Sequence, residues 1–199
     1  KALTVGNIGA DSEKLTTVSL TSTAGALAIG NIGKTTSTNV LDVTLNSKDA
    51  ITVTTGTIDS TKIGNISATS TAGAVTLGAI ASTATQIGDI TVNAKGNVSV
   101  GLIGHATEVA TSVGTISMTS TDGYIYAADI NTKDADGITV NMTAKTTIDK
   151  SNGSTQATVE NVGGNITASL AGAAAAYVDY KGKVVNLTAT NTGGLTSTI

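Results

Sequence analysis

The amino-acid sequence predicts an all-β protein, a right-handed parallel β-solenoid of about seven to eight coils with roughly 24 residues and three short strands per coil. Three observations support this prediction. Apolar runs recur at a nearly constant period, apolar and polar residues alternate within each run, and glycines stand between the runs. Because a unit of this size cannot bury its apolar face alone, successive units are expected to stack, with equivalent strands paired in parallel.

The first strand of each coil is predicted from apolar alternations that start 22 to 28 residues apart. Within residues 66–68, 90–92 and 116–118 the apolar side chains are two positions apart, as on one face of a strand. Thr and Val restrict χ1 and so favour a strand over a helix. The seven predicted starts are Val18, Val43, Ile66, Ile90, Ile116, Ile138 and Ile166.

Two further strands complete each predicted coil. A second alternation begins at Leu3, Leu27, Ile51, Val75, Val98 and Ile125, with spacings of 23 to 27 residues. A third element, a small residue with Ile two positions later, ends at Ile8, Ile32, Ile58, Ile80, Ile103 and Ile130. The side chains expected to point inward include Val75, Leu77, Ile80, Ile90, Val92, Val98, Val100 and Ile103.

Corners and loops are predicted between these strands. Glycines directly precede the second strand at Gly25, Gly73, Gly96 and Gly123. Asparagines at corners are expected to hydrogen-bond from coil to coil, namely Asn7, Asn31, Asn65 and Asn165. The length variation falls in residues 34–39, 81–86 and 104–112, which are expected to project as loops. Many short strands with turn signals also fit an antiparallel sandwich, but the 24-residue self-match favours the solenoid.

The whole chain, residues 1–199, is interpreted as a single solenoid segment with less regular coils in residues 131–199. Residues 2–9 and 26–33 are nearly the same sequence, so the chain opens within the repeat pattern. We therefore expect a fragment of a longer protein, with a secretion signal and anchoring modules outside it.

Composition excludes several classes of function. The chain has 11 basic residues, all Lys, against 14 acidic ones, which gives a net charge of -3 and no basic footprint for nucleic acid. The absence of Cys excludes disulfides, thiolate metal sites and cysteine catalysis. No apolar stretch approaches the roughly 20 residues that cross a bilayer, so no membrane insertion is expected.

The titratable residues do not predict an enzyme. His105 is the only histidine, and with Glu108 as the nearest acid no nucleophile, base and orienting acid can be assembled. It is interpreted as a solvated loop residue. Five acids fall in different phases of the repeat, unlike the paired carboxylates of a polysaccharide hydrolase: Asp11, Asp42, Asp59, Asp89 and Asp122.

The densest acidic group is Asp129, Asp134 and Asp136, followed by Gly137. Carboxylates and carbonyls in such a loop can hold Ca²⁺, which takes six to eight oxygen ligands. Solvated loop charge is the other interpretation, since the spacing is not that of an EF-hand or of the calcium-binding nonapeptide repeat. Calcium is the one cofactor that the sequence suggests.

Tyrosines are the only aromatic residues and they form two pairs. Each pair is predicted to present a carbohydrate or protein contact patch or to cover a corner of the solenoid. The pairs are Tyr124 with Tyr126 and Tyr177 with Tyr180.

The repeats are rich in Thr, Ala, Gly, Val, Ile and Asn and lack Cys. In this composition and repeat style the chain resembles surface-layer (S-layer) proteins of Gram-negative bacteria that leave by type I secretion. Runs such as residues 64–68 with 73–77, and 88–92 with 96–100, are also similar to the β-helical shaft of filamentous haemagglutinin-type adhesins. The sequence lacks the calcium nonapeptides frequent in the first family, and its unit is longer than the usual repeat of the second.

Both resemblances imply a secreted, non-catalytic protein on the extracellular cell surface. The leading hypothesis is a structural protein that self-assembles into an S-layer lattice, with further copies of itself as partners and cell-surface polysaccharide bound through modules outside this segment. The alternative is the shaft of a secreted β-helical adhesin. A carbohydrate-active β-helix enzyme is the third.

Overall fold

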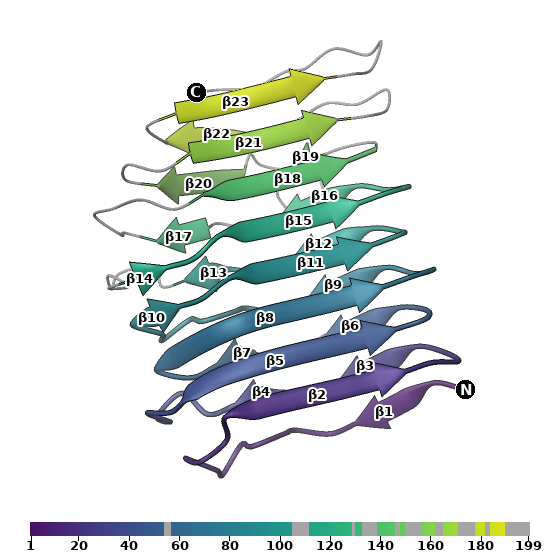
Figure 1. Cartoon of the computed structure of the whole chain (residues 1–199), viewed down its shortest axis with the longest axis vertical. Helices are drawn as coiled ribbons and strands as arrows, with labels where there is room; N and C mark the ends of the chain where they lie inside the picture. Colours follow the sequence, from purple (N-terminus) through teal and green to yellow (C-terminus); the bar gives the residue numbers. More distant parts are fainter. Residues whose placement is uncertain are drawn as a thin grey trace.

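The computed structural model is an all-β molecule in which parallel strands stack coil upon coil (Figure 1). It describes the backbone of residues 1–53, 57–104, 112–128, 130–132, 139–145, 148–149, 157–161, 165–170, 178–181 and 184–189. Side chains are described in 1–53, 57–104, 112–128 and 139–145 and at residue 130. Within these residues no helix has the length and apolarity needed to cross a lipid bilayer. The predicted fold class, a parallel β-solenoid, is confirmed.

One side of the solenoid is a ten-stranded parallel sheet, called the long sheet below. Its long strands cross the front of the molecule in Figure 1, and β10 (Gln86–Ile87) and β14 (Ser112–Val113) extend this side ahead of β11 and β15. The other strands are β2 (Thr17–Ser22), β5 (Val40–Ser47), β8 (Lys62–Ser70), β11 (Ile90–Ala94), β15 (Ile116–Ser120), β18 (Val140–Ala144), β21 (Asn165–Leu170) and β23 (Val184–Ala189).

Shorter strands form the other sides. A seven-stranded sheet, the short sheet, contains β1 (Leu3–Val5), β3 (Leu27–Ile29), β6 (Ile51–Val53), β9 (Val75–Leu77), β12 (Val98–Val100), β16 (Ile125–Ala127) and β19 (Ile148–Asp149). The third side consists of β4 (Ile32–Gly33), β7 (Ile58–Asp59), β13 (Ile103–Gly104), β17 (Ile130–Thr132), β20 (Ala157–Asn161) and β22 (Val178–Lys181). Isolated bridges at Ile80 join β7 to β13, so this side is also continuous.

The coil is right-handed, as predicted. From the N-terminus at the bottom of Figure 1, the long strands run left to right in front, and β17, β20 and β22 run right to left behind them as the chain climbs. About five turns of solenoid are formed, slightly fewer than the seven to eight coils predicted. Strands β18 to β23 extend the same parallel pairing.

The predicted register is confirmed with one exception. Each predicted second-strand start pairs with its equivalent in the next coil, from Leu3 with Leu27 to Val98 with Ile125. The first-strand starts also pair in one column from β2 to β15. In the next coil, however, Ile116 pairs with Val140, so the prediction of Ile138 was wrong by two residues. The side-chain period of a strand is two, so a two-residue slip leaves the apolar alternation unchanged and sequence alone does not detect it.

The core is a stack of aliphatic columns. All eight side chains predicted to point inward are at most 2 % exposed. Val92 illustrates the packing, since it pairs with Ala68 on one side and Met118 on the other and is 0 % exposed. Small aliphatic side chains suffice here because equivalent strands lie about 4.8 Å apart and fill each column from coil to coil.

The segments expected to project as loops are stacked in part on the neighbouring coils, although Thr35, Thr36 and Thr38 are exposed as expected. Ser37 is only 2 % exposed, and its carbonyl accepts hydrogen bonds from Ser60 Oγ at 3.2 Å and from Thr61 of the next coil. In turn, the Thr61 carbonyl accepts hydrogen bonds from the N–H of Thr85, at 2.8 Å, and from its Oγ1, at 3.0 Å. Ser and Thr hydroxyls thus replace the missing strand hydrogen bonds and hold this side against its neighbours.

Candidate functional site

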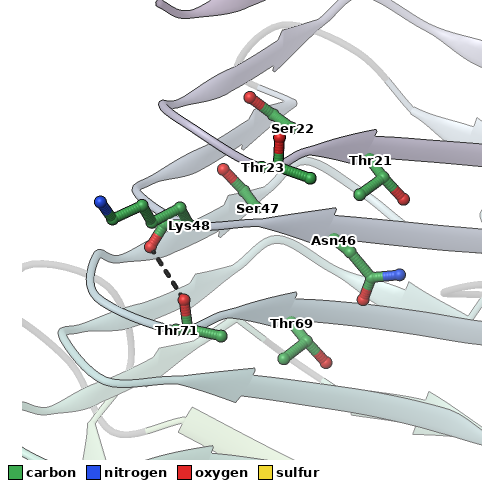
Figure 2. Close-up of a pocket in the computed structure, with 8 residues that line it drawn as sticks. All are labelled: Thr21, Ser22, Thr23, Asn46, Ser47, Lys48, Thr69 and Thr71. Atoms are coloured by element: carbon green, nitrogen blue, oxygen red, sulfur yellow. Dashed lines mark hydrogen bonds between the residues drawn. The ribbon is translucent and has the colours of Figure 1, made fainter.

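The most developed surface of the described residues lies where the long sheet ends and the chain turns toward the short sheet. Two solvent-open depressions of about 280 and 430 Å³ adjoin here and share Thr71. Figure 2 shows that the first is lined by polar residues of successive coils, which form columns along the stack. Together they make a shallow polar groove that runs from coil to coil.

Three columns of residues run along this surface; residues of the first two line the depressions, and the third column lies beside them on the sheet. The residue after the last paired position of each long strand gives the corner column, whose members are all exposed: Thr23, Lys48, Thr71, Lys95, Thr121 and Lys145. Two positions earlier, facing out of the sheet, lies the middle column of Thr21, Asn46, Thr69, Asn93, Thr119 and Thr143. The next outward position gives the far column of Ser19, Thr44, Ser67, Thr91, Ser117 and Asn141.

Buried serines fix the corner beneath the groove. Ser47 is 4 % exposed, and its Oγ donates to the Gly25 carbonyl of the preceding coil at 2.7 Å. Ser120 is 1 % exposed; its Oγ donates to the Gly96 carbonyl at 2.8 Å and accepts the Gly123 N–H at 3.1 Å. These bonds satisfy both the turn and the neighbouring coil, so the corner column stands on a defined backbone.

The groove carries positive charge on one flank. Lys48 extends away from the middle column and into solvent in Figure 2, while its carbonyl accepts a hydrogen bond from Thr71 Oγ1 at 3.3 Å. Among the described residues neither Lys48 nor Lys95 forms an ion pair, whereas Lys145 Nζ lies 3.4 Å from Asp122 Oδ1. Two ammonium groups two coils apart are therefore available to an anionic partner.

The asparagines divide into two kinds. At two corners they form the coil-to-coil ladders that were predicted: Asn7 Oδ1 accepts the Asn31 N–H at 2.9 Å, and Asn65 Oδ1 accepts the Asp89 N–H at 3.1 Å. The predicted role of Asn165 concerns a side chain outside the described residues. By contrast, the amide side chains of Asn46 and Asn93 make no hydrogen bond to any described residue, and they line the groove. Their donors and acceptors face solvent.

The acids are more ordered than the sequence suggested. Asp42 and Asp89 lie in one corner column with Asn65 between them, which corrects the expectation that these acids fall in different phases. Each carboxylate accepts a backbone N–H of the following coil, from Asn65 at 2.6 Å and from Thr115 at 2.7 Å. The correction arises because Asp and Asn are interchangeable as acceptors in such a ladder. The ladder's role is structural.

Asp59 has a similar task in the interior. Its side chain is 1 % exposed, and Oδ1 accepts hydrogen bonds from the Thr83 hydroxyl at 3.0 Å and the Thr83 N–H at 3.3 Å, while Oδ2 accepts from the Ser82 hydroxyl. A buried carboxylate with three donors is fully engaged in holding the next coil. The Asp59 carboxylate is therefore buried away from solvent and not accessible to a substrate.

Other predicted site residues lie outside the described part of the chain. These are the proposed calcium ligands Asp129, Asp134 and Asp136, the loop residues His105 and Glu108, and the side chains of Tyr177 and Tyr180. Within the described residues, no three His, Asp or Glu side chains are grouped to hold a metal ion. Tyr124 and Tyr126 do form a pair, with ring centroids 3.9 Å apart and an interplanar angle of 27°.

Sequence reasoning missed the groove, although its signal is present. The three columns read Ser-x-Thr-x-Thr in one coil and Thr-x-Asn-x-Lys in the next, and a comparison at a displacement of two coils would have found this. The groove residues can donate and accept hydrogen bonds and offer cations to a ligand. No protein-family model, curated protein or solved structure matches the chain, so the geometry alone supports the functional argument.

Proposed function

We propose that this chain is a rigid structural segment of a cell-surface protein, and that copies of it assemble side by side into a surface layer. The observation that carries the proposal is the coil-to-coil hydrogen bonding, which continues on every side of the solenoid. Backbone ladders join successive coils within the sheet on each side, and side-chain ladders join successive coils at the corners and on the loop side. A rod held in this way has few internal degrees of freedom, which suits a mechanical building block.

The surface supports the same proposal. Most outward positions of the long sheet carry Ser, Thr or Asn, with Val40, Asp42 and Lys62 among the exceptions. Among the described residues only Leu3 and Val40 are large exposed hydrophobics. A net charge of -3 on 199 residues allows copies to approach one another without strong repulsion. Lateral contacts would then be polar and hydrated, as in weak interfaces that are repeated many times.

An extracellular location follows from this role and is part of the proposal. Attachment to the cell, through polysaccharide-binding modules outside residues 1–199, is part of it as well. The resemblance to S-layer proteins in composition and repeat style supports the proposal, and the same solenoid would also serve as the shaft of an adhesin. The two roles differ in the object formed, a two-dimensional array or separate fibres.

Electron cryotomography of the cells that produce the protein tests the proposal. The expected result is a periodic surface array that disappears when the gene is deleted and returns with the parent gene or a Val92→Ile variant. A Val92→Asp variant, which disrupts the interior, should not restore the array. Separate fibres in place of an array would assign the adhesin role, and an unchanged cell surface after deletion would contradict both roles.

A further inference from the structure

The outer surface and the interior of the solenoid have different periods. In the corner column Thr and Lys alternate from Thr23 to Thr121, after five successive long strands. Lys145 follows the sixth strand, but its N–H donates to the Gly123 carbonyl instead of to Ser120. Over the first five coils the far and middle columns alternate in step with the corner column. They carry Thr and Asn, respectively, in β5 and β11, which the lysines follow, and Ser and Thr in β2, β8 and β15, which the threonines follow. The groove therefore repeats every two coils, which corresponds to about 10 Å.

The interior shows no such doubling. In the same strands the inward residues read Val-Leu-Ser, Val-Leu-Ser, Ile-Ala-Ser, Ile-Val-Ala and Ile-Met-Ser from β2 to β15. The outward residues of the short sheet, for example Ala28, Thr52, Thr76 and Ser99, do not alternate either. Duplication of a two-coil unit would have given the interior and the short sheet a two-coil period as well. The two-coil period is therefore a property of the groove residues.

Repulsion between lysines explains only part of this pattern. Lysines in adjacent coils would lie about 4.8 Å apart, and like charges directly opposite one another destabilise a sheet. Spacing them by a threonine removes this cost. It does not explain why Asn46 and Asn93 accompany the lysines, because an amide carries no charge and either position accepts Thr in other coils. The amide and the ammonium recur together as one recognition unit.

We propose that the groove binds a linear polysaccharide that carries one acidic group on every second sugar and lies parallel to the solenoid axis. An extended β-linked glycan advances by close to one strand spacing per sugar, so one disaccharide matches one two-coil repeat. In this arrangement the acidic groups face Lys48 and Lys95, and the amides of Asn46 and Asn93 bond the sugar hydroxyls. Threonine hydroxyls face the neutral sugars between them.

The unused bonding capacity of the groove supports this assignment. The corner asparagines and the buried serines are engaged within the protein, whereas the amides of Asn46 and Asn93 and the ammonium groups of Lys48 and Lys95 have no side-chain partner among the described residues. Sugar ligands are bound by such convergent hydroxyl and amide groups. The site goes beyond the proposed structural role, and its failure would leave that role intact.

Hyaluronan fragments, with a carboxylate on alternate sugars, are a suitable probe. Binding to the full chain is measured by isothermal titration calorimetry at low ionic strength, with chitin oligosaccharides as the uncharged control. We expect affinity to rise with each disaccharide up to the hexasaccharide, whose carboxylates face Lys48 and Lys95 and compete with Asp122 for Lys145. Affinity should fall with added salt, and the chitin fragments should bind at least several-fold more weakly.

A register-swap variant separates spacing from charge. Thr71→Lys combined with Lys95→Thr keeps the composition and net charge but places two lysines in adjacent coils, at exposed positions that leave the core unchanged. We expect this variant to lose affinity for the hexasaccharide by about two- to fivefold, as much as Lys95→Thr alone. Lys62→Gln, at the opposite end of strand β8, is the control and should bind like the parent.

Three results would overturn the proposal. Parent-like affinity of the register-swap variant would show that only net charge matters. Absence of saturable hyaluronan binding would contradict the assignment of an acidic glycan as the ligand. Preferential binding of phosphatidylserine vesicles over hyaluronan would assign the lysines to a lipid surface. Circular dichroism of each variant excludes misfolding as the cause of a loss.

Discussion

Replacing Val92 by Asp tests the interior most severely. Val92 is 0 % exposed and is stacked between Ala68 and Met118 in paired strands. The change removes a buried valine side chain, worth about 1.5–3 kcal/mol. It also buries a carboxyl group among aliphatic side chains with no hydrogen-bond partner, which costs about 1–3 kcal/mol even if the group becomes protonated.

For a chain of this size, each kcal/mol lowers the melting temperature by about 2–4 °C, so the variant should melt on the order of 10 °C below the parent. Thermal unfolding followed by circular dichroism measures this. Thr91→Asp is the matched control because Thr91 is the preceding residue of the same strand and faces outward; it should melt close to the parent. Equal melting of the two Asp variants would refute the assignment of inward and outward faces.

Three further predictions address the corners and the ion. Gly33→Ala should lower the melting temperature markedly, because Gly33 has a φ of +86° and an added Cβ would clash with the Asp59 carbonyl oxygen. Gly6→Ala, where an added Cβ meets nothing within 4 Å, should change it little. Asn65→Ala leaves the Asp89 N–H without its acceptor and should destabilise by about 1 kcal/mol in urea denaturation. Asn65→Asp keeps an acceptor but places a third carboxylate between those of Asp42 and Asp89, so its loss of stability should shrink with added salt, whereas that of Asn65→Ala should not. If calcium is bound by Asp129, Asp134 and Asp136, chelation should lower the melting temperature of the parent. A variant with Asn at all three positions should not respond to the chelator. Equal melting temperatures of the parent with and without calcium would contradict the predicted site.

The period of the apolar residues was sufficient to predict most of the fold. Strand starts such as Leu27 and Ile90 were assigned correctly because each coil buries the same few positions, and burial leaves a direct trace in the sequence. The register was wrong at Ile138, where an apolar residue two positions before Val140 extends the alternation. Strand pairing decides between such alternative starts, and the sequence of a single strand does not determine which residues of the neighbouring strand it pairs with.

The groove could not be found in the same way. Its residues are Thr, Asn and Lys, which also occur on ordinary solvated strand faces, so no single coil distinguishes a binding surface from a soluble one. The surface repeat at twice the period of the core becomes visible when Lys48, Thr71 and Lys95 are compared across coils, and the paired strands before them fix that alignment. Likewise, Asp42 and Asp89 became recognisable as one ladder only after Asn65 was placed between them.

A crystal structure of the chain with a hyaluronan octasaccharide is the most direct test of the claim that the outer face carries a two-coil repeat for a linear acidic glycan. We predict a glycan that runs along the stack, one sugar per coil, with carboxylates of alternate sugars beside Lys48 and Lys95 and amide contacts from Asn46 and Asn93. A glycan that crosses the strands, or that occupies another face of the solenoid, would contradict it.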